Sequence, residues 1–142
     1  ETIIATGCAT TTANYNVTIN ALPTPVISGL NTVCENVTGI IYSTPNVVGN
    51  TYLWAITGGT ITAGTGTNSI TVTWGAAGAG TLQLTETITA TTCAVTTSFY
   101  NVTKNANPTP VISGPATVCA GHAGDVYSTA SVAGRRPGHA GR

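Results

Sequence analysis

The chain has 142 residues, a length typical of one small domain or slightly more, and its four acidic and four basic residues leave no net charge. Threonine, valine and isoleucine supply 54 residues, whereas leucine supplies five and methionine none; because branching at Cβ disfavours helix and suits a strand, this composition excludes a helical bundle. No run approaches the roughly 18 apolar residues of a membrane helix, and the chain has no basic surface for nucleic acid.

An internal repeat organises the chain. Residues 1–49 align with residues 86–134 at an offset of 85, without a gap, and 31 of the 49 positions are identical. A period of 85 residues is too long for one coil of a solenoid and suits a small β-sandwich domain. We therefore expect an all-β fold in which β-sandwich units follow one another in tandem.

The repeat divides the chain into four parts. In chain order we expect the C-terminal part of a preceding repeat at residues 1–22, one complete repeat at 23–106, the N-terminal part of a following repeat at 107–134, and an atypical basic tail at 135–142.

The junctions between these parts share the pattern Asn-Ala-x-Pro-Thr-Pro, at residues 20–25 and 105–110. Two prolines in three residues stiffen a short linker and remove backbone donors. Because the chain begins at Glu1 without methionine or signal peptide, we expect a mature or excised piece. Its partial units could be completed by strands from a neighbouring chain.

Within the complete repeat, short β-rich runs alternate with turn residues, which is the pattern of a sandwich. The predicted strands lie at residues 25–28, 32–34, 39–44, 50–57, 59–63, 68–74, 80–90 and 95–104. Side chains alternate between the two faces of a strand, so one face of each should form the core. The predicted inward residues are Tyr52, Trp54, Ile56, Ile70, Val72, Trp74, Tyr100 and Val102, whereas Phe99 and most threonines should point outward.

Several runs of the complete repeat match a known family. They are Pro25-Val26-Ile27-Ser28-Gly29, Val33-Cys34, Tyr42-Ser43, Tyr52-Leu53-Trp54, Gly58-Gly59, the run 66–75 and Cys93. With these runs the chain resembles the PKD-like repeats of secreted Bacteroidota cell-surface proteins. The resemblance implies an immunoglobulin-like (PKD-like) β-sandwich and a non-enzymatic structural role in an extracellular fibre, filament or adhesin stalk. The alternative is a carbohydrate-binding or adhesive recognition module.

Four cysteines at matched repeat positions, in a chain of extracellular character, indicate disulfides. The resemblance places two cysteines in every repeat and so implies a Cys34–Cys93 bond that closes one unit. The alternative pairs Cys8 with Cys34 and Cys93 with Cys119, which would link successive units, and free thiols are a third possibility. Loop-closure entropy does not separate these pairings, because the stabilisation depends only weakly on loop length.

Three asparagines, Asn16, Asn36 and Asn101, each begin an Asn-Val-Thr sequon and are candidate glycosylation sites. Because threonine is so abundant, such sequons also arise by chance, and asparagine is common near strand ends. The exposed threonines offer hydroxyls for O-linked sugars, although threonine is also simply a good residue for an exposed strand.

No set of residues suited to catalysis is found. Glu1 and Glu86 occupy the same position in different repeats, so they are not a carboxylate pair. Cys119 and His122 offer two zinc ligands where a tetrahedral site needs more, and His139 lies in the tail. We therefore expect no catalytic residue, no metal site, no cofactor and no enzymatic activity.

The expected location and partners follow from the small number of charged residues. So few charges suggest a surface material whose solubility depends on hydroxyls, amides or attached sugars. We expect an extracellular, cell-surface location, with neighbouring repeats or further copies of the chain as partners in a fibre, and glycans as additional partners. Nucleic acid is not an expected partner, and no membrane span is expected.

Overall fold

The computed structural model describes residues 2–5 and 8–130, so the tail at 135–142 lies outside the described residues. All regular structure in the described residues is β, as the composition predicts. Eight strands form the central body: β3 (Thr32–Cys34), β4 (Ile40–Ser43), β5 (Asn50–Thr57), β6 (Gly59–Ala63), β7 (Ser69–Trp74), β8 (Gly78–Ile88), β9 (Ala94–Thr96) and β10 (Tyr100–Asn105). Two short pairs flank it: β1 (Thr2–Ile3) with β2 (Cys8–Ala9), and β11 (Ile112–Ser113) with β12 (Ser128–Thr129).

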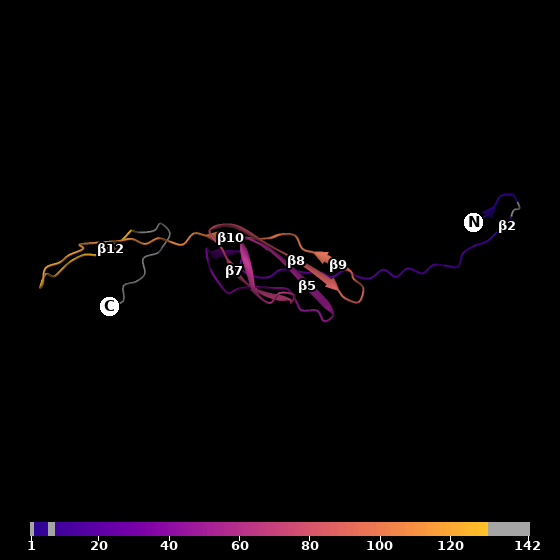
Figure 1. The fold of residues 1–142 in the computed structure, drawn as a ribbon, viewed down its shortest axis with the longest axis horizontal. Coiled ribbons are helices and arrows are strands. Elements are labelled where there is room, and N and C mark those ends of the chain that lie inside the picture. The colour runs from indigo at the N-terminus through magenta and orange to yellow at the C-terminus, as the bar shows by residue number, and fades with distance from the viewer. Residues whose placement is uncertain (1, 6–7, 131–142) are drawn as a thin grey trace.

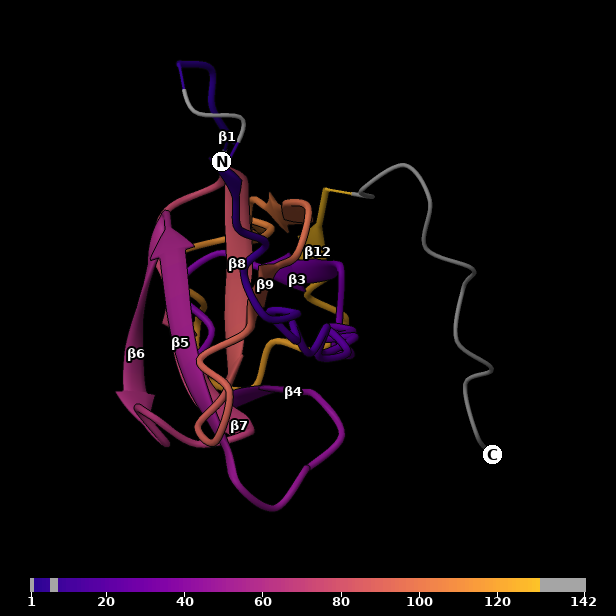
Figure 2. The same ribbon diagram turned by 90° about the vertical axis from the view of Figure 1, so that its right-hand side faces the viewer.

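The eight central strands form a two-layered sandwich (Figures 1 and 2). One sheet has the order β3-β10-β8-β5, with β9 also paired to β8, and the other has the order β4-β7-β6. The β3–β10 pair is parallel, and the other pairs are antiparallel. The prediction of an all-β sandwich is confirmed.

The predicted strand at residues 25–28 is wrong. This segment contributes only an isolated bridge between Ser28 and Ser43. Pro25 has no N–H to donate to a ladder. The N–H of Val26 donates to the side-chain hydroxyl of Thr44, at 3.4 Å, instead of to a backbone carbonyl.

The predicted single strand at residues 95–104 is in fact two strands. β9 and β10 both pair with β8, but their register shifts by one residue between Thr96 and Tyr100. Thr97 fills this bulge: its N–H donates to the carbonyl of Leu84 at 2.8 Å, and its hydroxyl accepts from the N–H of Leu84 at 3.1 Å. Such an extra residue bends the strand locally without ending the sheet.

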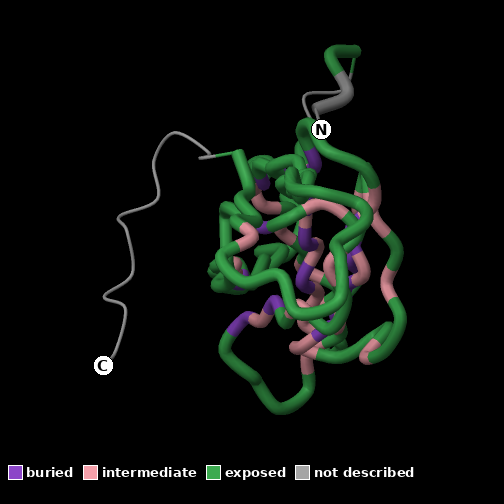
Figure 3. Tube along the Cα trace, turned by 90° about the vertical axis from the view of Figure 1, so that its left-hand side faces the viewer, coloured by how far each residue is buried: buried purple, intermediate pink, exposed green. Residues whose placement is uncertain are grey.

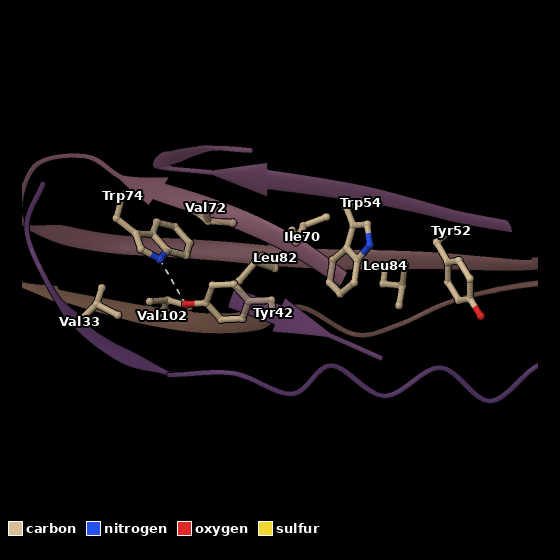
Figure 4. Packing of buried hydrophobic residues seen from close by; sticks show 10 residues of the cluster. All are labelled: Val33, Tyr42, Tyr52, Trp54, Ile70, Val72, Trp74, Leu82, Leu84 and Val102. Atoms are coloured by element: carbon tan, nitrogen blue, oxygen red, sulfur yellow. Dashed lines mark hydrogen bonds between the residues drawn. The ribbon is translucent and has the colours of Figure 1, made fainter. Parts of the chain in front are cut away.

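The buried residues gather inside the sandwich (Figure 3), and the core between the two sheets is built on two tryptophans (Figure 4). Trp74 donates its indole N–H to the hydroxyl of Tyr42 at 3.2 Å, with ring centroids 6.0 Å apart. Burial of each large apolar side chain contributes roughly 1.5–3 kcal/mol. The predicted inward residues are confirmed as buried, except that Ile56 and Tyr100 are half-buried. The buried hydrophobic residues are Val33, Tyr42, Tyr52, Trp54, Ile70, Val72, Trp74, Leu82, Leu84 and Val102.

Candidate functional site

The sandwich has two ends, separated by the eleven residues of β8. At one end, which we call the entrance end, Ile88 pairs with Asn50 and lies with the incoming residues 22–24 around one groove. At the other, which we call the exit end, Gly78 pairs with Lys104 near the end of the last strand. Figure 1 shows that the two flanking segments extend from opposite sides of the sandwich.

A clasp around Glu35 holds the outgoing chain at the exit end. The Glu35 carboxylate accepts the N–H of Asn107 at 3.0 Å and the N–H of Ala77 at 3.1 Å. The Asn107 side chain donates to the Glu35 carbonyl at 3.3 Å, and the Glu35 N–H donates to the Asn105 carbonyl at 2.8 Å. The Asn107 and then the Ala77 N–H lower the pKa of Glu35, because they stabilise the charged carboxylate. Sequence analysis missed this clasp, since its partners lie far apart in the chain.

Lys104 is buried at the same end of the sandwich. Its ammonium donates to the Gly58 carbonyl at 2.9 Å and lies 5.9 Å from the centre of a Trp74 ring, within cation–π range. Its burial follows the alternation of β10, in which Tyr100, Val102 and Lys104 share the inward face. The alternation could be read from the sequence, but a charged side chain was not expected to lie in the core.

A groove of about 470 Å³ lies at the entrance end. Pro23 of the incoming linker is buried and lines it. Beside it lies Glu86, 3% exposed, whose carboxylate accepts the side-chain amide of Asn50 at 2.6 Å. The incoming chain therefore forms part of the wall of this groove. Its lining residues are Leu22, Pro23, Thr24, Thr44, Pro45, Val47, Val48, Asn50, Glu86 and Ile88.

The two cysteines of the complete unit lie at opposite ends of the sandwich. Cys34 pairs with Asn105 at the exit end, whereas the Cys93 carbonyl accepts the N–H of Ile88 at the entrance end. Eleven strand residues at about 3.3 Å each separate the two ends by about 35 Å. A disulfide needs Cα atoms within about 7 Å. The Cys34–Cys93 bond implied by the resemblance does not fit this fold, and both thiols are free.

The remaining cysteine predictions fall on the flanking segments. Cys119 is exposed and its thiol is free. Cys8 lies in β2, where the structure describes the backbone. The alternative pairs Cys8–Cys34 and Cys93–Cys119 are therefore not formed by the described thiols of Cys34, Cys93 and Cys119.

All three sequon asparagines are exposed. Asn36 lies in a turn with φ of 56°, and its N–H donates to the Gly75 carbonyl at 3.0 Å. Asn101 lies on the outward face of β10, and Asn16 lies in the incoming segment. Their side chains are accessible to modification, and glycosylation stays a prediction.

The outer face of the larger sheet carries paired threonines. The hydroxyls of Thr57 and Thr81 lie 2.8 Å apart, and those of Thr85 and Thr96 lie 2.7 Å apart. Such cross-strand pairs stabilise a sheet by roughly 0.2–1 kcal/mol each. The exposed threonines therefore have a structural role independent of any attached sugar.

The described residues offer no constellation for metal binding. Within them, no group of three or more histidine, cysteine, aspartate or glutamate side chains comes together. His122 contacts Asp125 at 3.2 Å on the exposed surface, while His139 lies outside the described residues. No helix in the described ranges could span a membrane.

Comparison with known proteins gives one match. A family model described as PKD-like domain matches residues 20–102, which is more than half of the chain. Neither the curated proteins nor the solved structures include a significant match. The matched range covers the incoming linker and all of the sandwich up to the middle of β10.

Proposed function

The chain belongs to the PKD-like domain family, and from this premise we propose that it is a non-enzymatic structural repeat of an extracellular cell-surface fibre, filament or adhesin stalk. PKD-like domains are generally extracellular modules with structural or adhesive roles, and they are typically non-catalytic. The observation that carries the proposal is the opposite placement of entrance and exit, with both linkers held against the sandwich.

The flanking segments support a tandem arrangement, because they repeat local contacts of the complete unit. Two backbone pairings recur at the offset of 85: Thr87–Ala94 as Thr2–Ala9, and Ser28–Ser43 as Ser113–Ser128. The hydroxyl of Tyr42 donates to the Leu30 carbonyl at 2.7 Å, and that of Tyr127 donates to the Pro115 carbonyl at 3.0 Å. The partial copies thus have the local conformation expected for parts of further units.

The junction leaves little free linker between units. Leu22 lines the entrance groove, and Asn107 is held by Glu35 at the exit end. These two linker residues occupy the same position of the 85-residue repeat. In a tandem array one linker residue would therefore contact the exit end of one unit and the entrance end of the next, and consecutive units would abut.

The arrangement of the terminal strands suits a mechanical role. β3 and β10 are parallel neighbours, and the chain enters before β3 and leaves after β10. Tension on the chain would pull these strands in opposite directions along their length, which loads their hydrogen bonds together instead of one after another. Resistance to forced unfolding is set by the unfolding rate, which such shear geometry lowers.

Recognition of carbohydrate has less support. Sugar binding usually needs exposed aromatic rings. Trp54, Trp74 and Tyr52 are all buried, and Phe99, 63% exposed, is the one largely exposed aromatic residue of the complete unit, residues 23–106. Glycans fit better as attached groups, for which Asn36 and Asn101 are accessible on the unit's surface. We therefore place the structural role before the adhesive one.

Electron microscopy of the native secreted material tests the proposed function. A unit about 35 Å long predicts rods or filaments with an axial repeat of about 30–40 Å. Density projecting from the side would locate attached glycans. Isolated particles without an axial repeat would contradict the structural polymer and direct attention to adhesion.

A further inference from the structure

We infer that disulfides cross the junctions between consecutive units, each joining the exit-end cysteine of one unit to the entrance-end cysteine of the next. In this chain Cys34 is the exit-end cysteine of the complete unit, and Cys93 is its entrance-end cysteine. The inference rests on the proposed tandem arrangement. It differs from every pairing that joins two cysteines of this chain.

The repeat places the other pairings too far apart. In a stack, the Cys93–Cys119 pair would join the entrance end of one unit to the exit end of the next, since Cys119 occupies the position of Cys34. These are the outer ends of two stacked units, about 70 Å apart if each unit measures about 35 Å. The Cys8–Cys34 pair has the same geometry one repeat earlier.

The junction brings the remaining two positions together. Cys34 pairs with Asn105, and two residues later Asn107 occupies the repeat position of Leu22. Leu22 shares the entrance groove with Ile88, whose N–H donates to the Cys93 carbonyl at 2.9 Å. Two linker residues span at most about 7 Å, so the exit-end and entrance-end cysteines of successive units lie at the same junction.

Both side chains are available for this reaction. Cys34 follows the inward Val33 on β3 and therefore points outward, where it is exposed. Cys93 is half-buried in the turn after β8, with its sulfur 3.8 Å from the Thr91 carbonyl. Both thiols are free in the structure.

The chemistry is thiol–disulfide exchange with a small-molecule disulfide such as oxidised glutathione. One cysteine thiolate attacks the oxidant and releases one of its thiols; the second cysteine then displaces the other. The two cysteines lose two protons and two electrons, one S–S bond forms, and the oxidant is reduced to two thiols. A stack joined in this way is covalently linked at every junction in addition to its backbone.

The test uses a longer chain in which residues 1–134 are followed directly by a second copy of residues 50–107. The added copy completes the unit that begins at residue 108. Cys8, Cys93 and Cys119 are changed to serine, which leaves Cys34 and the copy of Cys93 in the added segment. The monomeric protein is oxidised with glutathione disulfide, alkylated, denatured and digested with trypsin. Lys104 is the sole tryptic site before its own copy, so digestion separates the two cysteines onto different fragments.

We expect the two fragments to run as one band that separates on reduction, and a matched variant that also carries Cys34→Ser to give separate fragments throughout. If the protein that keeps Cys34 and the copy of Cys93 gives separate fragments, and its solution scattering shows two units end to end, the disulfide is overturned and the tandem proposal stays intact. Separate fragments with scattering from units that fold back on each other would overturn both. A Cys34–Cys93 bond in monomeric 142-residue chain would also overturn the inference.

Discussion

The complete sandwich and its flanking copies share sequence but differ in burial. Tyr42 is fully buried, whereas its counterpart Tyr127 is 56% exposed; Val102 is 2% exposed, whereas its counterpart Val17 is 73% exposed. Yet the short backbone pairings recur in both. The two flanking copies contain no counterparts of residues 50–85, the segment that supplies both tryptophans of the core. Local pairing is therefore encoded in the repeated segment, whereas burial requires the segment that the copies lack.

The largest expected effect comes from removing one tyrosine ring at a time. Tyr42→Ala should destabilise the sandwich by about 3–5 kcal/mol, because it leaves a cavity against Trp74. The matched change Tyr127→Ala should alter stability by less than about 0.5 kcal/mol, since that ring is exposed. Chemical denaturation followed by tryptophan fluorescence measures both. Equal losses would show that the copies are packed as tightly as the unit.

A smaller effect is expected where a glycine lies against each tyrosine. A Cβ at Gly29 would collide with the Tyr42 ring, and one at Gly114 would collide with the Tyr127 ring. Gly29→Ala should cost about 1–3 kcal/mol, because the buried ring cannot move. Gly114→Ala should cost much less, since Tyr127 can turn into solvent. Thermal unfolding compares the two, and a large loss at Gly114 would contradict the account.

The threonine pairs on the outer face should contribute less again. A double-mutant cycle with Thr57→Val and Thr81→Val should give a coupling free energy of about 0.2–1 kcal/mol, from the loss of their shared hydrogen bond. The same cycle on Thr57 and Thr96, which do not pair, serves as control and should give none. A coupling free energy of equal size in both cycles would show that the hydrogen bond between Thr57 and Thr81 is not its source.

The smallest effect on global stability is expected at the exit clasp. The pKa of Glu35 is lowered in the folded state, so its contribution is present above the unfolded pKa of about 4.3 and is lost as pH falls through the folded pKa. The protection factor of the Asn107 amide, measured by NMR exchange relative to the rate of an unstructured peptide at each pH, should therefore fall on acidification while the core stays protected. Glu35→Ala should give fast Asn107 exchange at neutral pH. Unchanged exchange in that variant would show that Glu35 does not hold the linker.

Much of the fold could be predicted from local pattern. The bounds of β5 and β6 and the inward direction of Trp54 and Trp74 follow from alternation and turn glycines. The bulge at Thr97 could not be predicted, because the residues around it, apart from Ser98, are good strand formers. Pro25 was the one local sign that the segment it begins is unpaired.

The ends of the unit were less predictable than its core. The Glu35–Asn107 contact joins residues 72 positions apart, so only the closed sandwich brings them together. The resemblance gave two cysteines per unit but not their places along the sandwich axis. The parallel pairing of β3 with β10 puts Cys34 at the exit, and the turn after β8 puts Cys93 at the entrance.

The distance between Cys34 and Cys93 tests the central claim, that the chain enters and leaves a PKD-like unit at opposite ends. Both thiols would carry nitroxide spin labels in the full chain with Cys8→Ser and Cys119→Ser, and pulsed electron spin resonance would measure their separation. The account predicts about 30–40 Å, set by the length of β8. A separation below about 10 Å, or a disulfide between the two, would place both cysteines at one end and contradict the account.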